Sequence, residues 1–316
     1  MYGVYGEINT DITLFIGEYF MSQTFSMPEF PQPANPLAKY FRIPGVHVKI
    51  PSQGAFMPAG SISFTPAGDI PVYPMAARDE LLLKSPDALM SGYALEKLIE
   101  SCVPAILTPR LITTQDLDVL LLAIRVATYG ETMNLDATCP KCESVTQIRC
   151  HLPGLLATMK FVDPDNAVRL SDEVMAYVRP YNLVNATTVA LASYEEARKL
   201  RALDEQEPAA TTMVRNTAIS QSMDRINNLN LAMLGDCILK IVVPGAEVAD
   251  HRAIAEFVGN VPKPWIETID AKLRAINQGS IDKSLHVVCQ NEECKHEWDT
   301  EVELNPSNFF DADSSK

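Results

Sequence analysis

Several features are scarce in this chain of 316 residues, and each absence excludes a class of protein. Basic residues are few, since 26 Lys and Arg face 40 Asp and Glu, for a formal net charge of -14. Such a field repels phosphates, so nucleic acid and acidic membrane surfaces are not expected partners, and another protein is the better expectation. Long apolar runs are also missing. The run from Ile12 to Ile16 is too short to span a bilayer and follows no basic segment, so we expect no targeting or membrane segment.

Catalytic motifs are missing as well. The sequence contains no glycine-rich phosphate loop, no nucleophile elbow and no His-Glu-x-x-His helix. The adjacent Cys150 and His151 suggest a nucleophile at first, but a packed cysteine and a surface histidine in a strand explain them more simply. We therefore predict that the protein is not an enzyme.

The composition itself is that of a folded protein. Hydrophobic residues make up 47% of the chain and charged residues 21%, which is typical of globular domains. The length suggests about two domains and is sufficient for a core without disulfides. Short alternating runs and helical periodicities both occur, so we predict the α+β class.

Four of the seven cysteines stand in two close pairs. Cys139 and Cys142 enclose Pro-Lys, while Cys289 and Cys294 enclose four residues, and each pair is flanked by strand-like segments. Zinc accepts four thiolates tetrahedrally, so two turns that each present a pair can complete one structural site with no open position for catalysis. We predict a zinc-ribbon-like module, made in a reducing compartment such as the cytoplasm.

Alternatives to this zinc site stay open. His296 is a possible substitute ligand if Cys289 or Cys294 points away. A redox dithiol would instead leave Cys139 or Cys142 open to rapid alkylation. A nucleic-acid-binding ribbon is the main functional alternative. Its contacts to nucleic acid would come from Arg149, Lys283, His286 and Lys295. The overall charge opposes that function, which requires a basic stripe.

The cysteine pairs also predict how the chain is organised. A proline-rich extended arm is expected over residues 1–45, and a small β element followed by helices over 46–137. The split zinc-ribbon module takes residues 138–152 and 283–310, so residues 153–282 form an insertion. That insertion is predicted to be mainly helical, with a strand pair over 168–184 and one long helix over 213–241. Within the β element, strand-like runs are expected at 46–50, 61–64 and 70–73. The clearest helix is expected to begin after Thr113, which precedes Asp116 by three residues as in a capping box, to place its apolar residues on one face and to stop at Gly130.

A series of segments, in order, resembles the T-even-type bacteriophage baseplate hub assembly proteins. The resemblance covers about residues 38 to 310 and includes both cysteine pairs. Its main segments are Phe41-Arg-Ile-Pro44, Ile50-Pro-Ser-Gln-Gly54, Val72 to Glu80, Ser101-Cys-Val103, Asp116 to Arg125, Thr128-Tyr-Gly130, and Leu304-Asn-Pro-Ser-Asn-Phe-Phe310.

The resemblance implies a non-enzymatic protein of a contractile phage tail, with other tail or baseplate hub proteins as partners. It implies a location in the tail baseplate of the virion, or in the host cytoplasm during assembly. Phe309 and Phe310 are candidate partner-binding residues, although an aromatic pair packs against its own chain as readily as it binds a partner.

Overall fold

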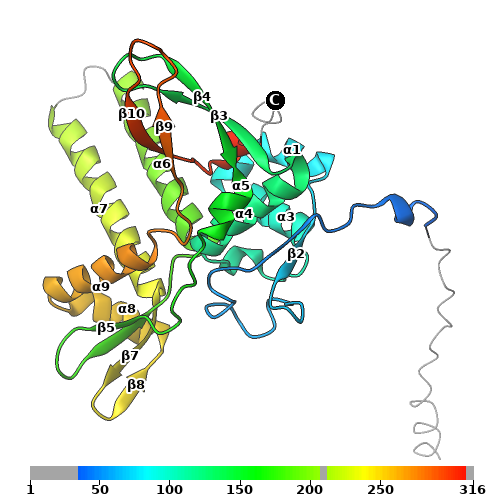
Figure 1. Cartoon of the computed structure of the whole chain (residues 1–316). Helices are drawn as coiled ribbons and strands as arrows, with labels where there is room; N and C mark the ends of the chain where they lie inside the picture. The colour runs from blue at the N-terminus through cyan, green and yellow to red at the C-terminus, as the bar shows by residue number, and fades with distance from the viewer. Residues whose placement is uncertain (1–34, 207–211, 311–316) are drawn as a thin grey trace, which may run out of the picture. The chain divides into compact units, whose positions relative to one another are not determined.

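The computed structural model describes residues 35–206 and 212–310, so residues 1–34 of the predicted arm lie outside the described residues. The chain divides into one unit that ends at Phe41 and a second that starts at Arg42. In the first unit, Ala38–Tyr40 form a short 3-10 turn, η1. All further description concerns the second unit, whose elements are labelled in Figure 1.

The β element predicted after the arm is a small antiparallel pair. Strand β1 (Val46–Val48) pairs with β2 (Ile70–Val72), and Val46 lies opposite Val72. The strand-like run at 61–64 was wrongly predicted as a strand, because Ile62 forms only an isolated bridge with Ile106. Pro66, which follows the run, cannot donate to a sheet, so the run ends before it can pair further.

Helices follow this pair. Helix α1 (Ala77–Leu83), α2 (Pro86–Met90) and α3 (Tyr93–Cys102) precede a 3-10 turn, η2 (Pro109–Leu111). Helix α4 (Thr114–Tyr129) begins where the sequence predicted, because the Thr113 side chain accepts a hydrogen bond from the Asp116 amide at 3.1 Å. It ends at Gly130, whose φ of 94° suits glycine.

The cysteine pairs lie in two antiparallel hairpins. Strand β3 (Thr132–Thr138) pairs with β4 (Val145–His151), and β9 (Ser284–Val288) pairs with β10 (Glu297–Glu301). A short helix, α5 (Leu152–Ala157), follows β4. Its first turn is stabilised by the His151 imidazole, which accepts from the Gly154 amide at 3.2 Å.

The region between the hairpins contains more sheet than predicted. Strands β5 (Ala167–Arg169), β6 (Met175–Val178), β7 (Ile238–Val243) and β8 (Ala246–Val248) form one antiparallel sheet in that order. The helix predicted over 213–241 was too long: α7 ends at Asp236. The run from Ile238 to Val243 is rich in β-branched residues and leads into a Pro-Gly turn, which favours a strand.

Four helices belong to this same region. They are α6 (Leu183–Gln206), α7 (Thr212–Asp236), α8 (His251–Asn260) and α9 (Lys263–Ile276). Helices α8 and α9 contribute Ile254, Ile269 and Leu273 to an apolar cluster with the sheet residues Val168 and Ile241. This cluster supplies the sheet with a core of its own.

A larger cluster joins both ends of the second unit. It runs from Val48 through the buried face of α4 to Phe309, on the last short helix, α10 (Pro306–Phe309). The chain is thus mixed α+β with several small antiparallel sheets, as predicted. The domain boundaries proposed from sequence stay a prediction. Within the described residues, no helix is both long enough and apolar enough to span a bilayer.

The start of α4 is where the inserted region meets the rest of the second unit. The Thr114 amide donates to the Tyr181 carbonyl at 2.9 Å, and the Gln115 carboxamide donates to the Ile276 carbonyl. Lys283 forms an ion pair with Asp118 at 3.1 Å, with both side chains about three-quarters buried. The segment after β6, the end of α9 and Lys283 just beyond the insertion are therefore all fixed to one helix.

Candidate metal centre

The four paired cysteines meet in space. Their sulfur atoms all lie within 4.8 Å of one another, although more than 140 residues separate the two pairs in sequence. The shortest sulfur distances cross between hairpins: 3.6 Å from Cys142 to Cys289 and 3.9 Å from Cys139 to Cys294. Four thiolates at the usual 2.3 Å from a tetrahedral zinc would be about 3.8 Å apart. The thiol donor set therefore fits one tetrahedral ion with little rearrangement.

The backbone of each turn brings its two cysteines together. In the first turn, the Cys139 amide donates to the Ser144 carbonyl at 2.9 Å, and the Glu143 amide donates to the Cys139 carbonyl at 3.0 Å. In the second, the Cys289 amide donates to the His296 carbonyl at 2.8 Å.

Both turns reverse direction in the same way. Glu143 and Lys295, each directly after the second cysteine of a pair, have φ angles of 59° and 45°. This left-handed conformation costs free energy in a residue with a side chain. Contacts with the surrounding structure must therefore hold each turn in this conformation.

Ser144 is the residue at this centre that the sequence analysis missed. Its hydroxyl lies 3.0 Å from the Cys142 sulfur and 3.3 Å from the Cys289 sulfur. Hydrogen bonds from the Ser144 side chain and backbone lower the pKa of the Cys142 thiol to about 6. A hydroxyl residue two positions after the second cysteine was the available signal. Residues of this type favour the thiolate form that a metal binds.

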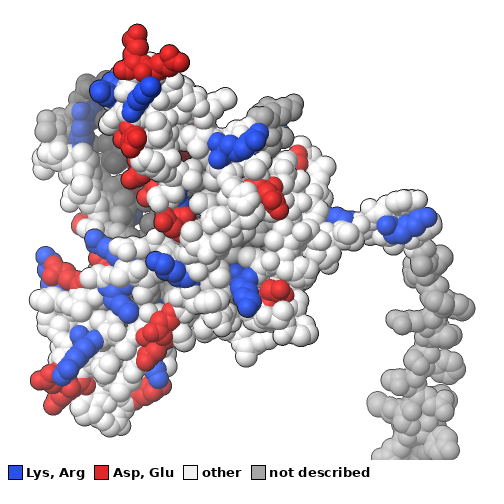
Figure 2. Space-filling view, in the orientation of Figure 1, with Lys and Arg blue, Asp and Glu red and all other residues white. Residues whose placement is uncertain are grey.

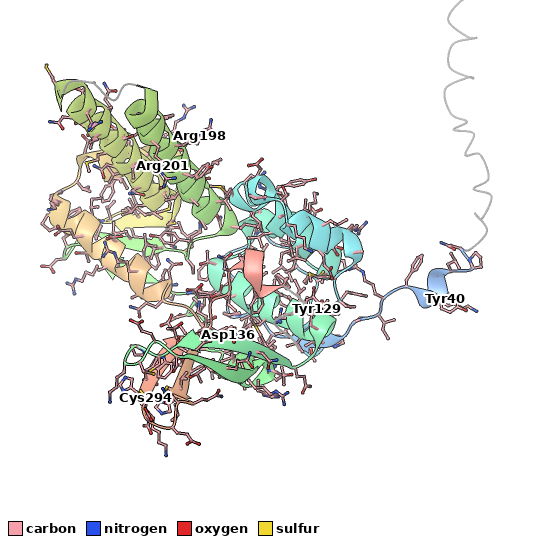
Figure 3. All side chains as sticks on the ribbon, turned by 90° about the horizontal axis from the view of Figure 1, so that it is seen from above. Tyr40, Tyr129, Asp136, Arg198, Arg201 and Cys294 are labelled. Carbon is pink, nitrogen blue, oxygen red and sulfur yellow. The ribbon has the colours of Figure 1, made fainter. Side chains whose placement is uncertain are left out.

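His296, the possible substitute ligand, is not a member of the four-cysteine cluster. The His296 imidazole stacks on Trp298 with 6.2 Å between ring centroids, whereas the fourth sulfur of the cluster is that of Cys294 (Figure 3). Cys139 and Cys289 are buried, while Cys142 is exposed. Cys102, Cys150 and Cys237 are buried elsewhere in the chain.

Phe309 and Phe310, the candidate partner-binding residues, have only 1% and 6% of their surface exposed. Their rings contact each other edge to face at 5.2 Å. The buried Arg125 guanidinium lies over the Phe309 ring and donates to the Phe309 carbonyl. Tyr129, at the end of α4 (Figure 3), donates to the Phe310 carbonyl at 3.0 Å. The structure thus places both rings in the larger core cluster of their own chain, and their role in partner binding stays a prediction.

Two of the four basic residues of the nucleic-acid alternative lie beside carboxylates. Lys283 is paired with Asp118, and the exposed His286 lies between Asp299 at 3.0 Å and Glu297 at 3.6 Å. Acidic and basic side chains are interspersed on the face shown in Figure 2. Carboxylates thus accompany two of the four predicted contacts.

Comparison with known proteins decides the family. The sequence model of the T4 bacteriophage base plate protein family matches residues 61–311. The chain belongs to that family. This baseplate assignment confirms the resemblance seen in the sequence, and the matched segment includes both cysteine pairs. No curated protein and no solved structure gave a significant match. As a baseplate protein, the chain has other phage baseplate proteins as its partners.

Proposed function

We propose that this baseplate protein is a non-enzymatic structural or assembly component of the central hub, acting through protein contacts. The family match over residues 61–311 carries the proposal. The composition supports it, because a net charge of -14 suits contact with other proteins better than contact with nucleic acid.

A structural zinc ion belongs to the same proposal. Cys139, Cys142, Cys289 and Cys294 would hold it, since four soft thiolates within 4.8 Å of one another match the ligand set and size of a closed zinc site. Such a site leaves no position for substrate, so its contribution is to bind the two hairpins to each other. Gln290 adds a direct link between hairpins, because its side chain donates to the Gln147 carbonyl at 3.1 Å.

The hub role is tested by composition of the particle and of its precursors. A tagged copy of the full chain is expressed during infection, and hub intermediates and finished tails are purified and analysed by mass spectrometry. We expect stoichiometric amounts of the chain in hub intermediates. Presence in finished tails as well identifies a virion component, and loss from them identifies an assembly factor.

Two results would contradict the hub proposal. One is absence of the chain from both hub intermediates and tails. The other is its presence only in peripheral baseplate parts, which would retain the baseplate family but exclude the hub.

A further inference from the structure

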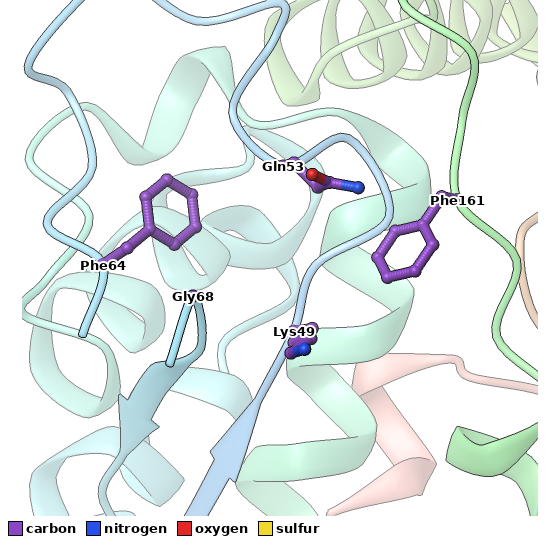
Figure 4. Close-up of a pocket in the computed structure, with 5 residues that line it drawn as sticks. All are labelled: Lys49, Gln53, Phe64, Gly68 and Phe161. Carbon is purple, nitrogen blue, oxygen red and sulfur yellow. The ribbon is translucent and has the colours of Figure 1, made fainter. Parts of the chain in front are cut away.

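A pocket lined by none of the cysteines has features of a recognition site. It has a volume of about 470 Å³ and is lined by Lys49, Gln53, Phe64, Gly68 and Phe161. Figure 4 shows the two phenylalanine rings on opposite sides, with Gln53 and Lys49 between them. Phe64 is 39% exposed and Phe161 is 53% exposed, so two large apolar side chains face solvent at one place. An arrangement of this kind is typical of an interaction site.

The first wall of the pocket is fixed by buried hydrogen bonds. The fully buried Asp116 carboxylate accepts from the Ser52 amide at 2.8 Å and from the Ser52 hydroxyl at 2.5 Å. The Gly54 amide in turn donates to the Ser52 hydroxyl at 3.0 Å. A Cβ atom at Gly54 would lie 3.4 Å from the Phe64 ring, so this ring packs directly on the turn. Phe64 is therefore positioned before any partner arrives.

The opposite wall is held at both sides of Phe161. The Lys160 amide donates to the Ser280 carbonyl at 2.7 Å, and the Val162 amide donates to the Pro51 carbonyl at 3.0 Å. The exposed ring thus extends from a fixed backbone rather than from a free loop. Because little ordering remains to be done when a partner binds, the two rings form a pre-organised apolar clamp.

The polar groups between the rings are the Lys49 ammonium and the Gln53 carboxamide (Figure 4). Lys49 makes no ion pair and its side chain no hydrogen bond to any residue that the structure describes, and the same holds for the Gln53 carboxamide. Gln53 also has a left-handed backbone, with φ of 51°. An unpaired ammonium in a chain of net charge -14 is a local site for an acidic group. An amide beside it matches a peptide group.

We propose that this pocket binds an extended acidic segment of a partner protein. An apolar side chain of that segment lies between Phe64 and Phe161, and a neighbouring carboxylate pairs with Lys49. The Gln53 carboxamide bonds to the segment's backbone. Lys49 selects an acidic segment, because it is positively charged and no carboxylate among the described residues pairs with it. This inference extends the proposed function to one surface, but its test uses the purified chain alone, so either can fail without the other.

The test measures binding of a short acidic peptide, Ac-Phe-Glu-Gly-NH2, by fluorine NMR of the full zinc-containing chain labelled with 4-fluorophenylalanine. Resonances of Phe64 and Phe161 are assigned from their leucine variants. We expect saturable shifts at these two positions, and weaker binding of the neutral match Ac-Phe-Gln-Gly-NH2. Lys49→Met should weaken the acidic peptide about three- to tenfold and leave the neutral one unchanged. Phe161→Ala should weaken both about tenfold.

Matched controls separate the pocket from general surface effects. Lys84→Met removes an exposed lysine elsewhere, and Leu81→Ala removes an apolar side chain that is 72% exposed. Neither should change peptide binding. The proposal is overturned if the acidic peptide causes no saturable shift, if Glu and Gln peptides bind equally, or if Lys49→Met binds normally. Binding of a single-stranded oligothymidylate at the same two rings, with both peptides inert, would overturn it in favour of a nucleic-acid site.

Discussion

The two cysteine hairpins and the four-stranded sheet of the insertion are both built from short antiparallel strands, yet they are stabilised differently. The sheet β5–β8 packs on α8 and α9 around a shared apolar cluster. The two hairpins have almost no core of their own. Among their described residues and apart from the cysteines, the buried apolar side chains outside both hydrophobic clusters are those of Ala137 and Val287. Two hairpins that share so small a core of their own need another source of stability, and under the proposed function a zinc ion held by the four sulfur atoms would supply it.

Removal of a sulfur ligand is the strongest test of this difference. Cys139→Ser should lower zinc affinity more than about 100-fold, because a closed four-thiolate site loses a ligand. Hydrogen exchange should then become fast in β9 and β10, while β6 and β7 keep their protection. Zinc content is measured by elemental mass spectrometry, and exchange by mass spectrometry of peptides.

Cys150→Ser is the matched control, since Cys150 is buried in the same hairpin but lies outside the sulfur cluster. It should retain one zinc ion per chain. Equal zinc contents in the two variants, or equal loss of protection in the hairpins and the sheet, would contradict the proposed zinc site between the hairpins.

The converse change removes apolar volume from the insertion. Ile269 on α9 is fully buried in the cluster beneath the sheet. Ile269→Ala should lower the free energy of unfolding by about 2–5 kcal/mol, through lost burial and the cavity left behind. Denaturant titration measures this loss, and zinc content should stay at one ion per chain. Leu239→Ala, which truncates a side chain 44% exposed on β7, should cost far less. If Ile269→Ala released zinc, the two regions would not be independently stabilised.

The pair of long helices α6 and α7 represents a third way of holding elements together. Glu196 is buried between them and accepts hydrogen bonds from Arg225, Lys199 and Ser222. These hydrogen bonds, of which the one from Arg225 has the largest effect, lower the pKa of Glu196 to about 2. A lowered carboxyl pKa stabilises the fold above the ordinary value near 4.5 and loses that effect as pH falls toward 2.

Glu196→Gln should therefore lower the melting temperature by about a few degrees at pH 7, a smaller effect than the core substitution. The difference from the unmodified chain should shrink as pH approaches about 3. Thermal melts followed by circular dichroism at both pH values check this. Its exposed neighbour provides the control, and Glu195→Gln should leave the melt unchanged at either pH. A deficit independent of pH would assign the effect to packing instead.

Local chemistry explains which parts of the fold and site the sequence could predict. The Thr113 cap, the α4 face and the cysteine pairs each depend on spacings within a few residues, and those spacings are visible in the sequence. The end of α7 was missed because Leu234 and Ile238 continue a helical spacing. The strand from Ile238 is stabilised by pairing with β6, more than 55 residues earlier. Such pairing is tertiary and overrides local periodicity.

Ser144 and the rings of Phe309 and Phe310 illustrate the same limit at the candidate site. The Ser144 hydroxyl acts on a sulfur of the other hairpin, a contact that spans 145 residues. Arg125, which lies 184 residues before Phe309, packs its guanidinium over the Phe309 ring and donates to the Phe309 carbonyl. The sequence showed an aromatic pair suited to either packing or recognition. It could not show that the pair packs against Arg125, because that residue is remote in the chain.

His286 offers the mildest test of how the hairpins are held when the metal is left in place. It lies across β9 and β10 from Asp299, with Glu297 nearby, and the hydrogen bond to Asp299 is the main cause that raises the pKa of His286 above 6.5. A raised histidine pKa stabilises the fold below pH 6.5, and this contribution is lost as pH rises through the raised value. His286→Gln should thus speed amide exchange in β10 by up to about threefold at pH 6, because exposed ion pairs contribute little, and should have no effect near about pH 9. Exchange rates corrected for intrinsic pH dependence measure the change.

His251→Gln, which removes an exposed histidine paired with Asp236, is the control and should not alter β10 at either pH. If the zinc site alone determines the stability of the hairpins, His286→Gln will also leave β10 unchanged at pH 6, and the difference between the two regions becomes sharper still.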